Sequence, residues 1–182
     1  HPIATTLSQL EDLNGRLEGR GSGQTEEEFQ ESIRQALVSF QGCERHDGWR
    51  LDADWVIASA LAVLGETESA VGRFREAPVA LARWRHVSAA WELLRVHLPP
   101  VEVEEWTRRL AIPHPAMAQC LEVLQQTITL QFEAARSALA GVSSIHADVL
   151  QSDLELRDVA SCLTIELALA QAETTPALAE TG

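Results

Sequence analysis

Cysteine and histidine side chains are spread too thinly along the chain to predict a metal site. Cys43 and His46 lie three residues apart and supply two of the four ligands that a structural zinc ion needs, but no second pair with comparable spacing follows. His86 and His97 share one predicted helix, about 16 Å apart along its axis, so a single metal ion cannot join them. We therefore expect no metal and no cofactor, with a haem held by one buried histidine as the open alternative.

Serine, histidine and aspartate occur together near residue 145, but they do not predict a hydrolase. The residues are Ser143, Ser144, His146 and Asp148. They lie at a predicted helix start, where serine caps the helix and aspartate complements its dipole. No Gly-x-Ser-x-Gly turn is present to expose a nucleophilic serine. All fourteen basic residues are arginine, which excludes Schiff-base chemistry and the lysine of a phosphate-binding loop. We expect that the protein is not an enzyme.

The centre of the chain is rich in arginine and tryptophan. The whole chain has 27 acidic residues against 14 arginines, and its net charge of −13 argues against nucleic-acid binding. Residues 71–97, in contrast, contain five arginines and two glutamates. Tryptophan beside arginine is typical of binding hot spots, although buried tryptophan and internally paired arginine are the ordinary alternative. The predicted binding residues of this region are Trp84, Trp91, Trp106, Arg83, Arg85 and His86.

A leucine stripe marks the N-terminal segment, residues 1–18. Its spacings of three, three and four residues predict one apolar face of an amphipathic helix, formed by Leu7, Leu10, Leu13 and Leu17. Residues 19–24 contain three glycines and no apolar side chain, so they predict a flexible linker. This junction also resembles an engineered fusion. The segment is therefore either a native arm or a partner's peptide tethered to its receptor.

The remaining elements that position these residues are all predicted to be helices, because alternating β-branched runs are absent. A capping box at Thr25 and Glu28 opens the first helix of a domain spanning residues 25–173, and Gly42 ends that helix. Further helices are expected from a cap at Asp52 or Asp54 to Leu64, and at 67–77, 78–98 and 102–110, and residues 174–182 are expected to form a loose tail. The predicted fold is an all-α, irregular bundle of about six to seven helices.

The C-terminal part predicts a long antiparallel hairpin of two helices, about residues 116–140 and 145–172. Apolar residues recur at near-heptad spacing in both helices, and a turn near residue 142 pairs positions whose numbers sum to about 284. Leu139 would then face Ile145, and Leu121 would face Leu163. Cys120 and Cys162 also fall across this hairpin, although helix axes 8–10 Å apart rarely permit a disulfide. No repeat of thirty-odd residues with fixed glycine, alanine and proline positions is apparent.

These patterns predict a non-enzymatic protein–protein interaction module: a helical adaptor, chaperone or regulator that binds an amphipathic helix of a partner or of its own N-terminus. The alternatives are a small-molecule sensor or enzyme with an inter-helical pocket near the central helices, and a self-associating scaffold. The expected partner is another protein or peptide; neither nucleic acid nor membrane is expected, and the oligomeric state is open. The widely spaced cysteines and the absence of a secretory signal at the start predict a cytoplasmic protein.

Overall fold

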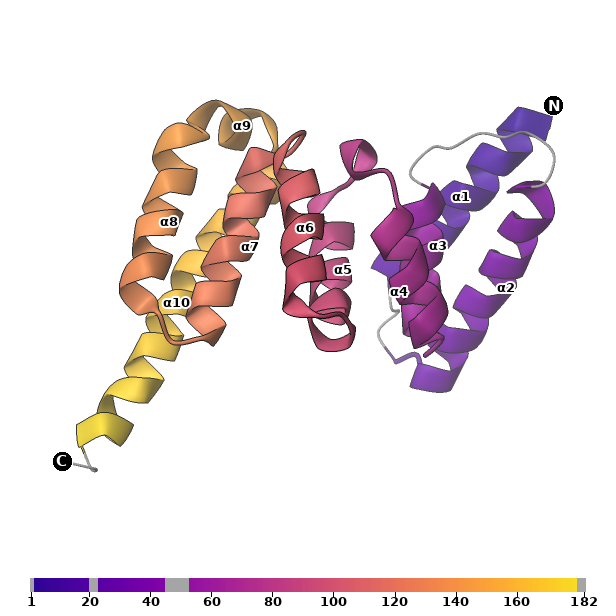
Figure 1. The fold of residues 1–182 in the computed structure, drawn as a ribbon. Helices are drawn as coiled ribbons and strands as arrows, with labels where there is room; N and C mark the ends of the chain where they lie inside the picture. Colours follow the sequence, from indigo (N-terminus) through magenta and orange to yellow (C-terminus); the bar gives the residue numbers. More distant parts are fainter. Residues whose placement is uncertain (1, 20–22, 45–52, 180–182) are drawn as a thin grey trace. The chain divides into compact units, whose positions relative to one another are not determined.

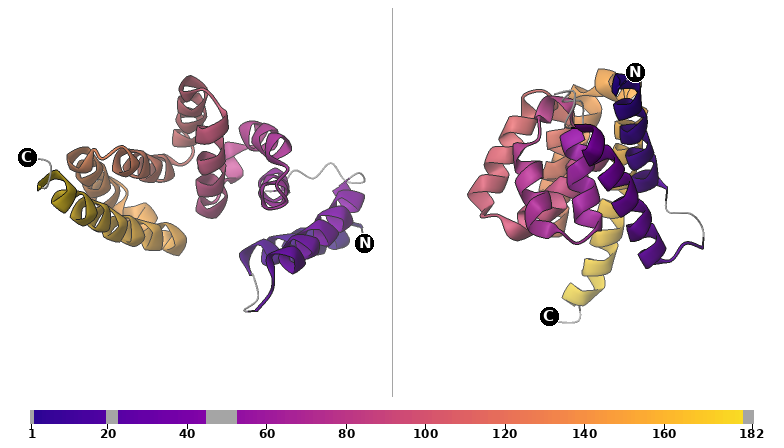
Figure 2. Two further views of the ribbon diagram at one scale, coloured as in Figure 1. Left: turned by 90° about the horizontal axis from the view of Figure 1, so that it is seen from below. Right: turned by 90° about the vertical axis from the view of Figure 1, so that its right-hand side faces the viewer.

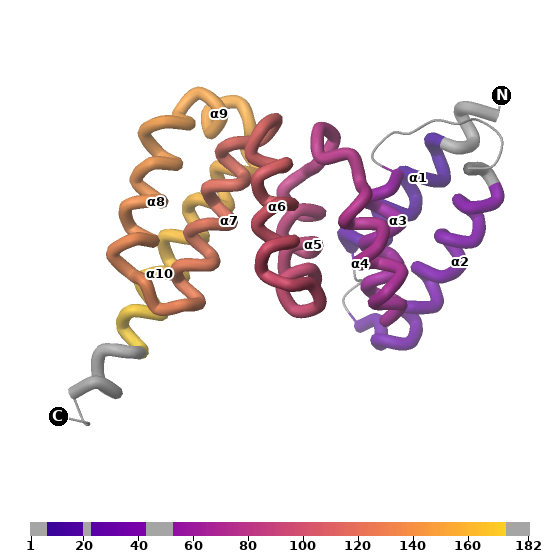
Figure 3. Tube along the Cα trace, viewed as in Figure 1, coloured from indigo at the N-terminus to yellow at the C-terminus, as the bar shows by residue number. Residues whose placement is uncertain are grey.

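The computed structural model describes the backbone of residues 2–19, 23–44 and 53–179, and the side chains of residues 7–19, 23–42 and 53–173 (Figure 3). Every regular element within these ranges is a helix, so the all-α prediction is confirmed there. The chain divides into two compact units, His1–Val103 and Glu104–Gly182. The central part of the predicted linker (residues 20–22), the loop with His46 and the last three residues lie outside the described residues. No helix among the described residues combines the length and apolar character needed to cross a membrane.

The first unit is built around one mostly buried helix. Its elements are α1 (Pro2–Glu18), α2 (Glu26–Glu44), α3 (Ala53–Val63), α4 (Thr67–Glu76), a 3-10 turn η1 (Val79–Leu81) and α5 (Trp84–His97) (Figure 1). The α1 helix lies beside α2 (Figure 2), and α3 packs against α1, α2, α4 and α5. A helix that contacts four neighbours must be apolar over most of its surface, and seven of the eleven residues of α3 are buried.

The start of α2 forms the predicted capping box. The Thr25 hydroxyl oxygen accepts a hydrogen bond from the Glu28 backbone N–H at 3.2 Å, and the Glu28 carboxylate accepts one from the Thr25 N–H at 2.9 Å. The bond from the Thr25 N–H to the Glu28 carboxylate lowers the pKa of Glu28, and the Thr25 side chain lowers it further. The prediction that Gly42 ends this helix is wrong, because α2 continues to Glu44.

The second unit contains α7 (Pro115–Ile128), α8 (Phe132–Ile145), α9 (Ala147–Ser152) and α10 (Leu154–Ala179), and α6 (Pro100–Ala111) crosses from the first unit into it. The α7 and α8 helices pack against each other, and α10 packs against both (Figure 1). The predicted hairpin of two long helices is wrong in detail, because the chain reverses between α7 and α8. Ile145, predicted to face Leu139, is 74% exposed.

Three other helix boundaries also differ from the predictions. The predicted helix 78–98 consists of η1 and α5, because Ala82 and Arg83 adopt extended backbone between them. The predicted second long helix is divided at Asp153, whose extended backbone separates α9 from α10. The α10 helix then continues to Ala179, so most of the predicted loose tail is helical. Neither division carries a glycine, and α10 is instead capped by the Asp153 carboxylate, which accepts a hydrogen bond from the Leu156 backbone N–H at 3.0 Å.

The hairpins α3–α4 and α7–α8 turn in the same way at positions 65 residues apart. Gly65 and Leu130 have positive φ angles of 77° and 60°. The next residue of each turn donates its N–H to the carbonyl five residues earlier: Glu66 to Leu61 at 2.9 Å, and Gln131 to Gln126 at 2.7 Å. This pattern is the Schellman motif that ends many helices. The two hairpins therefore share the same turn geometry, although the residues that form it differ.

Equivalent positions also join the two helices of each hairpin. In α3–α4 the Arg73 guanidinium lies 3.4 Å from the Asp54 carboxylate. In α7–α8 the Gln119 side-chain amide donates to the Ala138 carbonyl at 3.1 Å. These pairs are again separated by 65 residues, so the repetition extends from the turn into the helices.

Candidate functional site

The N-terminal helix α1 supplies the first half of the candidate site. Its leucine stripe forms as predicted: Leu13 is fully buried, Leu10 is 7% exposed, and Leu7 and Leu17 are half-buried. The helix continues through Gly15, where a Cβ would meet no atom within 4 Å. The apolar face of α1 is therefore enclosed by the first unit, and its polar face is left outward.

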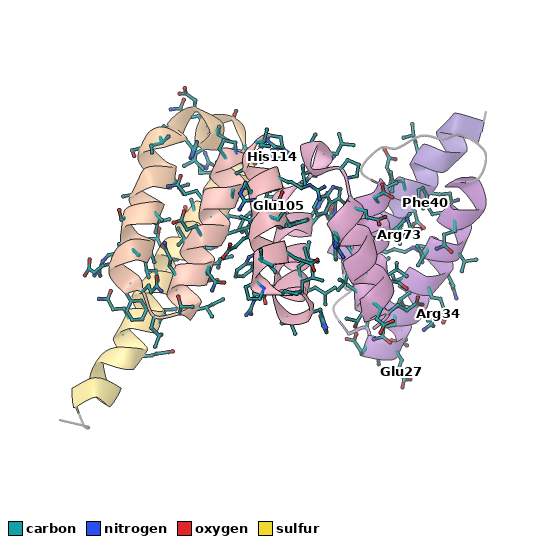
Figure 4. All side chains as sticks on the ribbon, in the orientation of Figure 1. Glu27, Arg34, Phe40, Arg73, Glu105 and His114 are labelled. Carbon is teal, nitrogen blue, oxygen red and sulfur yellow. The ribbon has the colours of Figure 1, made fainter. Side chains whose placement is uncertain are left out.

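The second half of the site is the surface of α2 and α3 against which α1 packs, and we call this surface the docking face. The α2 helix contributes a stripe of buried residues: Ile33, Ala36, Leu37 and Phe40. The spacing of three and four residues places this stripe on one side of the helix, and Figure 4 labels Phe40 upon it. Exposed Arg34 and Glu31 are not part of this stripe and pair with each other. The docking face is thus apolar.

In addition to the leucines, two charged side chains of α1 contact other helices of the first unit. The Arg16 guanidinium donates to the Ser32 hydroxyl of α2 at 2.9 Å and to the Ser32 carbonyl at 3.4 Å. The Glu18 carboxylate forms an ion pair with Arg85 of α5. Polar contacts therefore tie the C-terminal end of α1 to two different helices.

The predicted arginine and tryptophan residues lie on α5 and α6, and their aromatic rings are enclosed. Trp84, Trp91 and His86 are buried on α5, whereas Arg83, at the start of this helix, is exposed. Trp106 is buried on α6 and belongs to the second unit. Within this group, Arg85 contacts the leucine segment through its ion pair with Glu18.

His86 lies in an aromatic cluster that the sequence did not indicate. Its ring stacks on Trp55 of α3, with ring centroids 6.3 Å apart and planes inclined by 11°. Trp55 also contacts Phe74 of α4, and its indole N–H donates to the Pro78 carbonyl at 3.0 Å. The cluster joins three helices, so the buried position of His86 has a clear packing role.

The described side chains place no group of three or more histidine, cysteine or acidic residues that could hold a metal ion. Cys120 is buried and Cys162 is exposed, and neither forms a disulfide. The Ser143 and Ser144 hydroxyls donate to carbonyls four residues earlier in α8, which satisfies them within the helix. The side chains of Cys43 and His46 lie outside the described residues.

Comparison with known proteins gave no match to a family model, a curated protein or a solved structure.

Proposed function

We propose that the first unit is a non-enzymatic protein–protein interaction module whose docking face binds an amphipathic helix of a partner protein. In the uncomplexed chain α1 occupies this face, and a partner helix with a similar leucine stripe replaces it. Such a module serves as an adaptor, chaperone or regulator. The burial of Leu10 and Leu13 is the observation that carries this proposal.

The chemistry of α1 matches that of helices that dock into apolar surfaces. Recognition of this kind uses anchors at i, i+3 and i+7 or close to them, and the stripe of α1 has this spacing. Each leucine that moves from water to the docking face contributes about 1.5–3 kcal/mol. Four such anchors, two of them only half-buried, are enough to hold a short helix whose own stability in water is marginal.

The connection between α1 and α2 supports exchange of the bound helix. Its sequence is rich in glycine and contains no apolar residue, which is the composition of a flexible linker. A short flexible linker gives a tethered segment an effective concentration in the millimolar range. A partner helix therefore displaces α1 only if its affinity or its local concentration is high enough to compete with the effective concentration of the tethered α1.

The test uses the complete chain with a protease recognition sequence inserted between Arg20 and Gly21. After cleavage, the released segment is diluted away, and binding of a fluorescently labelled peptide of residues 1–18 is measured by anisotropy. We expect saturable binding and competition by unlabelled peptide. A peptide carrying Leu10→Asp and Leu13→Asp should bind at least about a hundredfold more weakly, because both anchors, each contributing about 1.5–3 kcal/mol, are lost.

Two results would contradict the proposal. In the first, the cleaved chain keeps its helical circular dichroism but binds no peptide. In the second, the doubly substituted peptide binds as tightly as the original. A peptide with Glu11→Gln is the matched control, because Glu11 is exposed on the polar face of α1.

A further inference from the structure

The leucine stripe of α1 does not define a single bound position. A shift of three residues along the helix brings Leu7 to the place of Leu10, and Leu10 to the place of Leu13. A shift of seven residues brings Leu10 to the place of Leu17. These shifts move the helix by about 4.5 Å and about 10.5 Å. Because apolar burial is non-directional, the leucines alone tolerate such slipped registers.

Arg16 and Glu18 make the contacts that distinguish the registers. They lie two residues apart, so they project from nearly opposite sides of α1. Arg16 bonds Ser32 on α2, and Glu18 pairs with Arg85 on α5. A shift of about 4.5 Å would break both contacts at once, since hydrogen bonds are lost well within that distance.

Each of these two side chains is held in place by a neighbour four residues earlier. The Asp12 carboxylate accepts a hydrogen bond from Arg16 Nε at 3.0 Å. The Asn14 amide donates to Glu18 Oε1 at 2.8 Å. These bonds restrict the rotamers of both long side chains. The conformational entropy that Arg16 and Glu18 lose on contacting α2 and α5 is therefore smaller.

Resting on the proposed function above, we propose that Ser32 and Arg85 determine the register and direction of the bound helix. The docking face then selects helices of a particular chemistry: a leucine stripe that ends in an arginine and a carboxylate two residues apart. The arginine meets Ser32, and the carboxylate meets Arg85. A helix bound in the reverse direction presents these groups at the wrong end, where neither partner is available.

The two contacts contribute selectivity more than affinity. The side chains of Arg85 and Glu18 are 31% and 46% exposed, so solvent weakens their attraction. We expect peptide Glu18→Gln to bind the cleaved chain about threefold more weakly than the original peptide at about 0.15 M salt. A change in affinity of this size is typical of charged contacts that fix the register of a bound helix.

The decisive experiment exchanges the charges. The chain variant Arg85→Glu should bind the original peptide about tenfold more weakly, and peptide Glu18→Arg should restore most of that loss. Peptide Glu11→Gln and chain variant Arg34→Glu are the controls, since Glu11 and Arg34 are exposed and form no hydrogen bond or ion pair across this interface in the described structure. Both should bind within about twofold of the original pair.

The outcomes separate this inference from the function on which it rests. If all peptides bind but the charge exchange gives no restoration, the docking face binds helices without using Arg85, and the inference is wrong. If no peptide binds the cleaved chain, both proposals fail together. Should Arg85→Glu not fold, Glu18→Gln and Glu18→Arg on the unsubstituted chain still decide the matter: equal affinity for these and the original peptide overturns it.

Discussion

Leu130 has the backbone conformation of a glycine. Its φ of 60° lies in the left-handed region, which costs an L-residue about 1–2 kcal/mol, and Gly65 occupies the equivalent turn at φ 77°. We predict that Leu130→Gly raises the free energy of unfolding by up to about 1 kcal/mol, after the greater chain entropy of glycine is subtracted. Gly65→Leu should lower it by a similar amount. Urea denaturation monitored by circular dichroism measures both changes.

The geometry around these two residues makes the pair a controlled comparison. A Cβ at Gly65 would meet no atom within 4 Å, so steric collision does not contribute to the cost of Gly65→Leu. Leu130 is 58% exposed, so its removal sacrifices little buried surface. A decrease in stability for Leu130→Gly would show that side-chain burial outweighs backbone strain at this turn.

We expect the two cysteines whose side chains are described to differ in reactivity, because one is buried and the other is exposed. Burial raises the pKa of Cys120 to about 12, because the interior disfavours the thiolate. We predict that iodoacetamide at pH 8 modifies exposed Cys162 within minutes, and modifies Cys120 only in denaturant. Peptide mass mapping after timed quenching distinguishes the sites, and rapid labelling of native Cys120 would contradict the expectation.

The same shift predicts a loss of stability in alkali. The folded-state pKa of Cys120 is raised above the unfolded value of 9.0, so the unfolded chain releases this proton first as the pH rises. The contribution of the neutral thiol is therefore complete below about pH 9 and declines as the pH approaches 12. Cys120→Ala should flatten this part of the stability profile, as measured by urea denaturation between pH 8 and 11.

At the scale of elements, the capping box makes the stability of the start of α2 depend on pH. The pKa of Glu28 is lowered by its bonds to Thr25, so its contribution is present above the unfolded value of 4.5 and is lost as the pH falls through the lower folded value. We predict that wild type and Glu28→Gln differ most in unfolding free energy above pH 5, and converge towards pH 3.

Thr25→Ala tests the other half of the capping box. Loss of the hydroxyl leaves the Glu28 backbone N–H without its cap and should cost about 1 kcal/mol of unfolding free energy at pH 7. Thr25→Ser, which keeps the oxygen, is the matched control and should retain most of the stability. Equal losses for both variants would show that the threonine methyl group, rather than the cap, stabilises this helix.

Helix boundaries were predictable where residue type decides the backbone, and were missed where it does not. The start of α2 and the end of α3 follow from Thr25, Glu28 and Gly65, whose chemistry favours a cap or a left-handed turn. The break between α7 and α8 falls on Leu130, an unfavourable residue for such a turn. Packing of α7 against α8 must compensate for that strain, and such long-range packing is invisible to a local pattern.

At the scale of the whole molecule, the sequence predicted the leucine half of the candidate site better than the polar half. Periodicity identified the stripe that includes Leu10 and Leu13, because an amphipathic helix must enclose its apolar face. The partner of Arg85 could not be identified, since Glu18 lies on another helix 67 residues earlier in the chain. The enclosed Trp84 and Trp91 show equally that composition does not distinguish a core from a surface.

The net charge of the chain sets a further expectation for exchange of the bound helix. Residues 1–18 carry three acids and one arginine, a charge of −2 out of the total of −13, which leaves −11 on the rest. The unbound segment 1–18 and the rest of the chain therefore repel each other over long distances, although Glu18 and Arg85 attract each other once in contact. Salt shortens the range of this repulsion from about 30 Å at 0.01 M to about 8 Å at 0.15 M.

We therefore predict that the association rate constant of the 1–18 peptide with the cleaved chain rises about threefold over this salt range, as measured by stopped-flow anisotropy. Most charge-steered complexes show the opposite trend. Peptide Glu11→Arg has no net charge and should associate faster at low salt, with little salt dependence. A rate that falls with salt for the original peptide would mean that local attraction near Arg85 dominates the encounter. If the rate rises, a partner helix with a basic outer face should associate faster than α1 does. This difference in association rate would favour the partner over the N-terminal helix, because the rest of the chain is acidic.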